Sequence, residues 1–131
     1  MEDIKSQIRE YLGTFKQGYR EKAYFGLIEM NHNIIPDLID EFRKEKDTQT
    51  RAFLVEVIWQ HRQQSIIPFL AEVLNDPAHE VWKEAMDGLV ALHSPDSVAA
   101  LRSAKLRKFS RQKDTLQFRK WLEEAIEQAE A

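Results

Sequence analysis

The side chains in this sequence that could bind a metal ion or act as an acid or base are its four histidines and the carboxylates near them. Glu29 and His32 have the Glu-x-x-His spacing of di-iron proteins, in which two such pairs and further carboxylates meet on facing helices. No second pair of this kind is present, and residues 31–33 have the composition of a turn. The other histidines lie near predicted turns and helix ends, without His-x-x-x-His spacing: His61, His79 and His93. We therefore predict no metal site.

Other patterns that carry chemistry are missing from the sequence. There is no glycine-rich phosphate loop, no nucleophile elbow and no Ser/His/Asp set at a familiar spacing. The 131 residues include no cysteine, which excludes disulfides and thiolate ligands. Apolar runs are short, so no membrane span is expected, and the acidic N-terminus lacks the apolar core of a signal peptide. We predict no catalytic residue, no cofactor and a cytoplasmic protein that is not an enzyme.

Positive charge is concentrated near the C-terminus, although the whole chain carries a net charge of −3. Residues 102–120 contain eight basic residues and a single acidic one, Asp114. The candidate basic patch consists of Arg102, Lys105, Arg107, Lys108, Arg111 and Lys113. It is either an anchor for phosphates, RNA or an acidic protein, or a solvated surface that pairs with Glu123 and Glu124. Because only Phe109 interleaves with the densest part of the run, and the net charge is negative, nucleic acid is not the expected partner.

Apolar residues recur at the three- and four-residue spacing of amphipathic helices, and this spacing predicts an all-α protein. Ser65 is expected to cap one helix, with Pro68 in its first turn, and Asp76 to cap the next, with Pro77 as its first residue. The eight expected helices cover about residues 3–15, 19–30, 34–44, 48–62, 66–74, 77–92, 95–108 and 116–128. Residues 109–114 are expected to form an irregular loop.

The helices come in pairs that repeat along the chain. Residues 33–38 match residues 65–70 at an offset of 32, and residues 98–101 match residues 67–70 at an offset of 31. The predicted second helices align at offsets of 31, which superposes Arg20, Arg51 and Trp82. A period in this range is typical of helical repeats. One helix pair cannot bury both of its apolar faces, so the pairs must stack on one another.

This pattern, with Ile-Ile-Pro-x-Leu, Asn-Asp-Pro and a closing Ser-Pro, resembles the HEAT and HEAT-like repeat family over residues 33–101. The resemblance implies a right-handed α-solenoid of about four stacked antiparallel helix pairs, in a family used mostly to bind other proteins. HEAT-like repeats often have an Asp in the turn and an Arg early in the second helix, which form a ladder between repeats, and Arg20 fits this pattern in part. Asp47 and Arg51 fit, whereas Trp82 replaces the Arg in the best-matching repeat. We predict one domain, 1–131, with repeats at about 1–31, 32–63, 64–94 and 95–131.

In a solenoid of this kind the second helices usually line the concave side, and a helical wheel identifies their outward positions. Transferring those positions between repeats gives a strip that combines aromatic and charged residues. The predicted partner-binding residues are Phe25, Phe53, Glu56, Lys83, Glu84, Asp87 and Trp121. Large aromatic anchors surrounded by charge are typical of interaction surfaces. Alternatively, Phe25 and Phe53 pack against the first helices of their own repeats.

We therefore predict a protein–protein interaction module, such as an adaptor, scaffold or inhibitor, that binds a basic or amphipathic segment of another protein. The alternative is an enzyme or enzyme accessory of the HEAT-like type, either a bilin lyase or a protein that acts on nucleic acid. A base-excising enzyme needs a basic groove with a catalytic acid, whereas the predicted strip is acidic. A bilin lyase of this kind is usually longer, and nothing in the sequence marks a pigment site.

Overall fold

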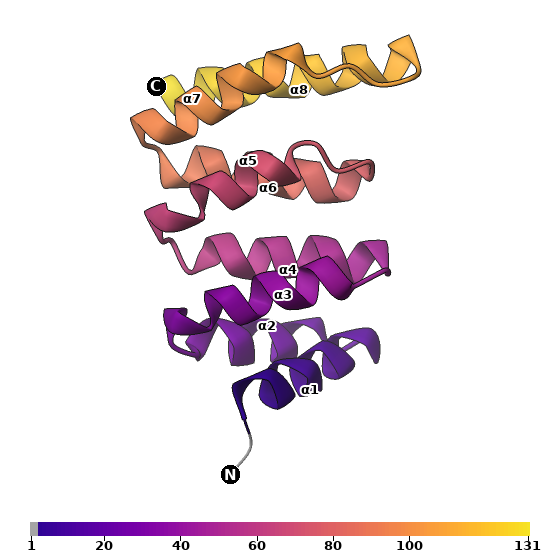
Figure 1. Ribbon diagram of the computed structural model, residues 1–131, viewed down its shortest axis with the longest axis vertical. Coiled ribbons are helices and arrows are strands. Elements are labelled where there is room, and N and C mark those ends of the chain that lie inside the picture. The colour runs from indigo at the N-terminus through magenta and orange to yellow at the C-terminus, as the bar shows by residue number, and fades with distance from the viewer. Residues whose placement is uncertain (1–2) are drawn as a thin grey trace. The chain divides into compact units, whose positions relative to one another are not determined.

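The computed structural model describes residues 3–131, and within that range every regular element is helical. Three short 3₁₀ turns are present: η1 (His32–Ile34), η2 (Gln64–Ile66) and η3 (Ala104–Leu106). The eight α-helices of the described range are α1 (Ile4–Lys16), α2 (Arg20–Glu29), α3 (Ile35–Lys44), α4 (Thr48–Gln60), α5 (Ile67–Val73), α6 (His79–Leu92), α7 (Pro95–Ser103) and α8 (Gln112–Glu130). The predicted all-α fold is confirmed (Figure 1). None of these helices is both long enough and apolar enough to cross a bilayer.

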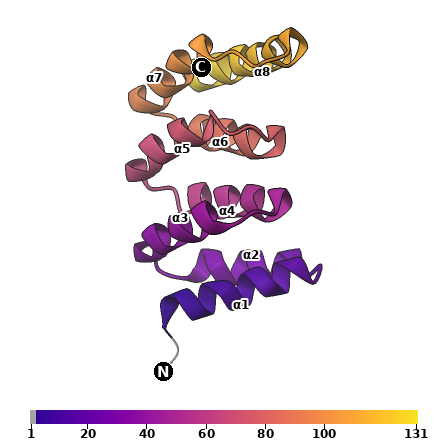
Figure 2. The same ribbon diagram turned by 45° about the vertical axis from the view of Figure 1, so that its right-hand side comes forward.

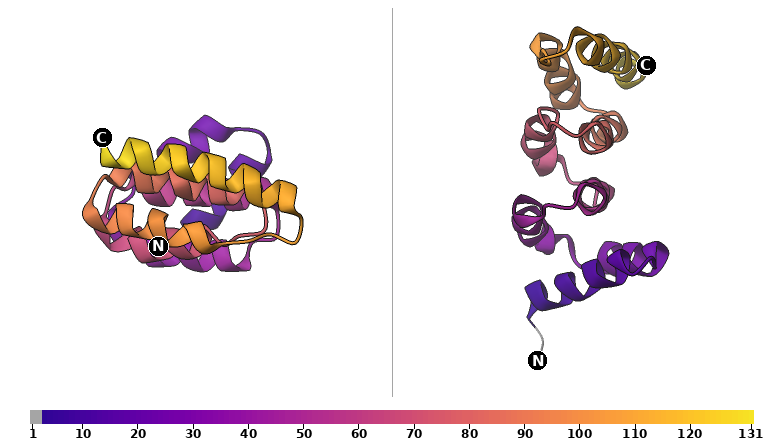
Figure 3. Two further views of the ribbon diagram at one scale, coloured as in Figure 1. Left: turned by 90° about the horizontal axis from the view of Figure 1, so that it is seen from above. Right: turned by 90° about the vertical axis from the view of Figure 1, so that its right-hand side faces the viewer.

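The helices belong to two compact units, which divide between Arg62 and Gln63. In the first unit α1 packs against α2 and α3 against α4, while α1 also contacts α3 and α2 contacts α4. The second unit repeats this arrangement, with α5 on α6 and α7 on α8, and with contacts between α5 and α7 and between α6 and α8. Figure 2 shows the short connections between consecutive helices, and Figure 3 shows the helices of a pair side by side. Each unit is therefore two stacked helix pairs, as the repeat requires.

Three helices begin where the sequence provides an N-cap. The side chains of Asp3, Asp47 and Ser94 each accept a hydrogen bond from the backbone amide three residues later, at 2.7, 2.9 and 3.2 Å. These amides have no partner inside their own helices, so the caps fix the starts of α1, α4 and α7. Pro95 follows Ser94 as the first residue of α7, where its missing N–H costs no hydrogen bond.

Two predicted caps in the central repeat are wrong, because local hydrogen bonds replace them. Ser65 lies inside η2, where the amide of Ile66 donates to the carbonyl of Gln63 at 3.2 Å, and α5 begins only after this turn. The carboxylate of Asp76 accepts a hydrogen bond from the amide of Ala78 at 2.9 Å. That bond forms a turn of the Asx type, so α6 begins two residues later than predicted.

The last helix also begins earlier than predicted, at Gln112 instead of residue 116. The carboxylate of Asp114 in its first turn binds Arg111, with 2.9 Å between Oδ2 and Nε. At the next residue, the Thr115 hydroxyl accepts a hydrogen bond from the amide of Phe109 at 2.8 Å. These contacts order a segment that the sequence predicts to be irregular, and they shorten the loop before α8.

Trp82 forms the centre of an aromatic cluster in the second unit. Its side chain is 3% exposed, and its ring meets the ring of Phe118 edge to face with 4.8 Å between centroids. Phe109 and Trp121 lie 6.4 and 6.1 Å from the same ring. Edge-to-face pairs of this kind stabilise a core beyond the area that they bury. Trp82, which occupies the repeat position of Arg20 and Arg51, therefore packs α6 against α8.

Candidate functional site

A groove runs between α6 and α8 in the second unit. Its lining comes from residues three or four apart on each helix, so that one face of α6 and one face of α8 form its two walls. The lining residues are Lys83, Met86, Asp87, Val90, Trp121, Glu124, Ala125 and Gln128. Three of the predicted partner-binding residues, Lys83, Asp87 and Trp121, therefore lie together. Glu84 is half-buried on α6 and does not line the groove.

Trp121 is held in a fixed position in this groove. The ammonium group of Lys83 lies 4.0 Å from the centroid of its ring, a cation–π contact. The rings of Trp82 and His79 meet the indole at steep angles, each with 6.1 Å between centroids. Asp87 and Glu124 are exposed in the same groove. The groove thus combines a rigid, half-buried indole with exposed carboxylates.

The first unit places its predicted residues differently. Phe25 is 56% exposed and touches the ring of Tyr24 edge to face, at 5.4 Å. The prediction that Phe53 faces a partner is wrong, because its side chain is only 3% exposed. Its ring stacks on Phe15 of α1 at 4.1 Å, with 13° between the planes. Phe53 is therefore a packing residue, but its ring contacts the first helix of the preceding repeat instead of the first helix of its own, whereas Phe25 is exposed.

Glu56 is partly buried, and its carboxylate accepts a hydrogen bond from the guanidinium of Arg20. This ion pair joins α2 to α4, and the guanidinium also lies 5.9 Å from the centroid of the Phe53 ring. Arg51, the other Arg at this repeat position, lies over the ring of Phe42 at 4.6 Å. The arginines of the repeat pattern therefore pack on aromatic rings of their own unit.

The predicted basic patch divides into paired and exposed charges. Arg102 pairs with Glu130 and Arg111 with Asp114, so the expected pairing with Glu123 and Glu124 is replaced by these two carboxylates. Three lysines of the patch are exposed: Lys105, Lys108 and Lys113.

Arg107 acts as a structural clamp. Its guanidinium donates hydrogen bonds to the carbonyls of Leu74 and Asp76, the latter at 2.8 Å, just beyond α5. It also lies over the ring of Phe109, 3.9 Å from the centroid. Burial lowers the pKa of Arg107, and the nearby charge of Asp76 acts in the opposite direction.

Two of the histidines, His61 and His79, make side-chain contacts within the fold, and His93 is exposed. His61 is half-buried, and its Nε2 lies 3.2 Å from the carbonyl oxygen of Leu27. Burial lowers the pKa of His61, and the hydrogen bond to Leu27 opposes this shift. His32 is exposed, and Nδ1 of His79 lies 2.8 Å from the carboxylate of Glu80. Across residues 3–131, no three His, Asp or Glu side chains are close enough together to hold a metal ion.

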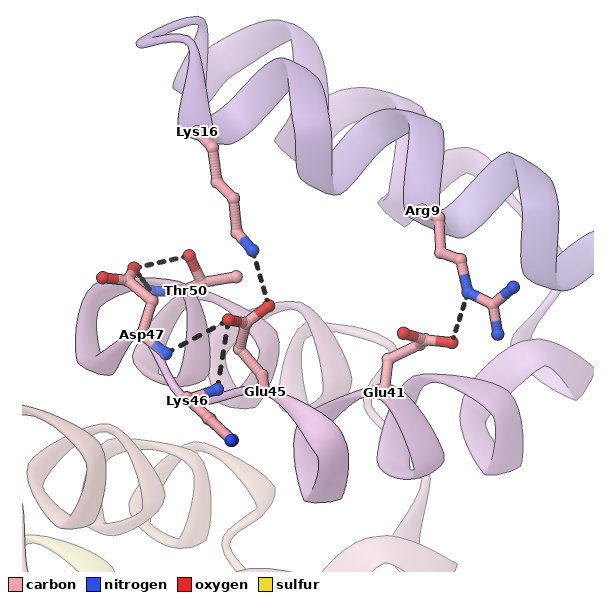
Figure 4. Close-up of polar contacts among 7 residues, drawn as sticks. All are labelled: Arg9, Lys16, Glu41, Glu45, Lys46, Asp47 and Thr50. Carbon is pink, nitrogen blue, oxygen red and sulfur yellow. Dashed lines mark hydrogen bonds and ion pairs between the residues drawn. The ribbon is translucent and has the colours of Figure 1, made fainter.

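A row of ion pairs between α1 and α3 was not predicted from the sequence. Nε of Arg9 lies 3.1 Å from Oε1 of Glu41, and Nζ of Lys16 lies 2.9 Å from Oε1 of Glu45 (Figure 4). Nζ of Lys5 extends the row, 3.6 Å from the carboxylate of Asp40. Bases four and seven residues apart in α1, facing acids at positions 40, 41 and 45 in and just after α3, are the signal that could have revealed this row.

Glu45 also terminates α3 and connects it to α4. Its other carboxylate oxygen accepts hydrogen bonds from the amides of Lys46 and Asp47, at 3.2 and 3.1 Å (Figure 4). Burial raises the pKa of Glu45, but the hydrogen bonds from Lys16, Asp47 and Lys46 outweigh burial and lower it. The Glu45 carboxylate therefore orders the turn between α3 and α4 and also binds Lys16 of α1.

The comparison with known families agrees with this architecture. The family model for HEAT repeats matches residues 35–126, well over half of the chain. No curated protein and no solved structure matches the chain. HEAT repeats generally serve as protein-interaction modules, and the family is typically non-enzymatic. Because the match covers most of the stacked helix pairs described above, the chain belongs to the HEAT repeat family.

Proposed function

We propose that this chain is an interaction module, not an enzyme, and that the groove between α6 and α8 binds a basic, amphipathic segment of another protein. The supporting observation is that the groove combines the indole of Trp121 with the carboxylates of Asp87 and Glu124. Trp is among the residues that contribute most to binding energy, above all where its ring is already held in place. We also propose that the chain acts in the cytoplasm as an adaptor, scaffold or inhibitor.

The chemistry of the groove specifies the partner segment. Met86, Val90 and Ala125 offer apolar contact along its walls, and an apolar side chain of the segment fills the space beside Trp121. Lysine or arginine side chains on either side meet Asp87 and Glu124. These carboxylates are exposed, so they raise affinity chiefly through the association rate, and they also determine specificity. Binding therefore weakens as salt screens the charges.

The first unit contributes a separate contact to the proposal. Phe25 is an exposed aromatic side chain, whereas Glu56 already pairs with Arg20 and serves the fold. We assign Phe25 to partner binding and withdraw Phe53, whose ring is buried.

The test uses the full chain and synthetic amphipathic peptides that are matched in length and apolar content but carry basic, acidic or neutral polar residues. We expect basic peptides to bind more tightly than acidic ones in this groove. Glu124→Lys should weaken them by about tenfold, a loss of roughly 1.4 kcal/mol. Glu127→Lys is the matched control, because Glu127 is exposed on the same helix but does not line the groove. Trp121→Ala should weaken every peptide that binds there.

The proposal fails if the three peptide classes bind equally, or if Glu124→Lys and Glu127→Lys have the same effect. Circular dichroism of each variant shows whether helices are retained, so that a lost fold is not mistaken for a lost contact.

A further inference from the structure

A second surface of the same unit carries charge of the opposite sign. Three cations near the C-terminus already have partners within the chain: Arg102 and Arg111 pair with carboxylates, and Arg107 donates to backbone carbonyls. Within residues 3–131, no carboxylate lies at ion-pair distance from the remaining cations of this segment, which are Lys105, Lys108, Lys113, Arg119 and Lys120. The corner where the chain enters α8 therefore carries an excess of positive charge without an internal partner.

A pocket lies among these cations. Lys108 and Arg119 are part of its lining, and Phe109 and Leu116 provide apolar surface next to them. Leu116 is 58% exposed, which is high for a leucine. Nε of Arg119 is buried without a hydrogen-bond partner among the described residues, and such a donor normally has one.

The pocket is held in shape by the fold itself. The amide of Phe109 donates to the Thr115 hydroxyl at 2.8 Å, which fixes the loop to α8. Arg107 stacks on the Phe109 ring at 3.9 Å and donates to the carbonyl of Asp76 at 2.8 Å, which fixes the loop to the end of α5. A partner therefore binds a loop that is already ordered, and less conformational entropy is lost.

The combination of charge and apolar surface selects one class of partner. A phosphate group or the backbone of a nucleic acid would use the cations but leave Leu116 exposed. Base stacking needs an open aromatic face, whereas Phe109 is half-buried and already stacked with Arg107. A peptide with Asp or Glu on both sides of an apolar residue uses both features, because its carboxylates meet Lys108 and Arg119 while its apolar side chain covers Leu116.

We propose that the pocket formed by Lys108, Phe109, Leu116 and Arg119 binds an acidic peptide segment through one apolar side chain flanked by carboxylates. This site is independent of the groove between α6 and α8, because the two share no residue and have opposite charge. The chain thus has separate surfaces for two segments.

The test measures fluorescence anisotropy of labelled peptides in which Asp and Glu flank a central leucine, with the full chain as receptor. Replacing the central leucine of the peptide by serine should weaken binding by about tenfold. Lys108→Glu should weaken it by a similar factor, while Lys105→Glu, a matched exposed lysine outside the pocket, should weaken it by no more than about threefold.

A second matched pair tests the apolar contact. Leu116→Ser should weaken binding, whereas Leu106→Ser should not, since Leu106 is 85% exposed but lies outside the pocket. Both leucines are exposed, so neither change removes a core contact. The Glu124→Lys variant should bind the acidic peptide at least as well as the unaltered chain, which separates this site from the acidic groove.

Three results would overturn the proposal. The first is an equal loss of binding in Lys108→Glu and Lys105→Glu, which indicates nonspecific attraction of anions. The second is equal binding of the leucine and serine peptides. The third is displacement of the labelled peptide by single-stranded RNA, or by vesicles of anionic lipid, at a lower concentration of negative charge than the unlabelled peptide requires. Retention of helix content in every variant is verified by circular dichroism.

Discussion

The two glycines inside helices of the first unit predict opposite effects for the same substitution. Gly13 lies in α1, and a Cβ atom added there meets no heavy atom within 4 Å. Gly26 lies in α2 under the ring of Tyr11, where an added Cβ would collide with Cε1 and Cζ and lie 2.7 Å from Cδ1. Unstrained carbon atoms of this kind keep about 3.5–4.0 Å apart, so either the ring or α2 must move.

Two opposing free energies determine whether each substitution stabilises or destabilises the protein. Replacing a glycine by alanine inside a helix stabilises the protein by roughly 0.5–1 kcal/mol, since glycine loses more backbone entropy on folding. Overpacking costs about 1–3 kcal/mol. Gly13→Ala has only the gain and should stabilise the protein by about 0.5–1 kcal/mol. Gly26→Ala has both effects and should destabilise it by about 1 kcal/mol, because the Tyr11 ring is large and is joined to α1.

The assay is urea unfolding followed by circular dichroism, with both single variants, Tyr11→Ala and the double variant Tyr11→Ala/Gly26→Ala. If the collision with the ring is the cause, adding Gly26→Ala to the Tyr11→Ala background should stabilise the protein. The coupling energy between the two positions should then be about 2 kcal/mol. The reasoning is refuted if Gly26→Ala alone is as stable as the unaltered chain, or if removing the ring leaves its effect unchanged.

Three further changes test the assignments made above. Phe53→Ala should destabilise the fold by about 3–5 kcal/mol, because it empties a buried site against Phe15, whereas Phe25→Ala should stay within about 0.5 kcal/mol; thermal melts compare the two. Arg107→Ala should cost about 1–3 kcal/mol in urea unfolding, since two carbonyls at the end of α5 lose their donors, and Arg107→Lys should recover only part of it. Folding lowers the pKa of His61 below its ordinary value of 6.5, so the unfolded chain binds more protons and the free energy of unfolding falls as the pH falls through and below that value. The urea midpoint should drop between about pH 7.5 and pH 5.5, and His61→Gln should make that drop smaller.

The sequence predicted the elements and their pairing because both depend on regular spacing. Apolar side chains every three or four residues define one face of each helix, and a face that is left uncovered requires a stacked neighbour. Asp47 could be recognised as a cap because it precedes a helix whose first amides lack partners, whereas Asp3, the cap of α1, was placed inside the first helix. Ser65 and Asp76 satisfy the same rule of composition, but both lie in local turns, so the rule alone misplaced the starts of α5 and α6.

The remaining errors concern contacts between residues far apart in the chain. Phe53 occupies an outward position on the wheel of α4, but Phe15 of α1 covers it, and no property of α4 alone reveals that. Arg107 belongs to a basic run by composition, yet its position is set by two carbonyl groups more than thirty residues earlier. A helical wheel locates a side chain around one axis and carries no information about which neighbour lies there.

The last helix connects the two proposed sites through its charge order. Helix dipoles favour acidic residues in the first turn and basic residues in the last, by about 0.3–1 kcal/mol per charge. α8 has the reverse trend, with Lys113, Arg119 and Lys120 in its first half and four glutamates in its second half. Only Asp114 in the first turn follows the dipole, and Arg111 neutralises it. The dipole acts on the first and last turns only, where Lys113 and Glu130 oppose it. Each proposed partner brings charge of the sign that its part of α8 lacks: acidic where α8 begins, basic beside Glu124 in its second half.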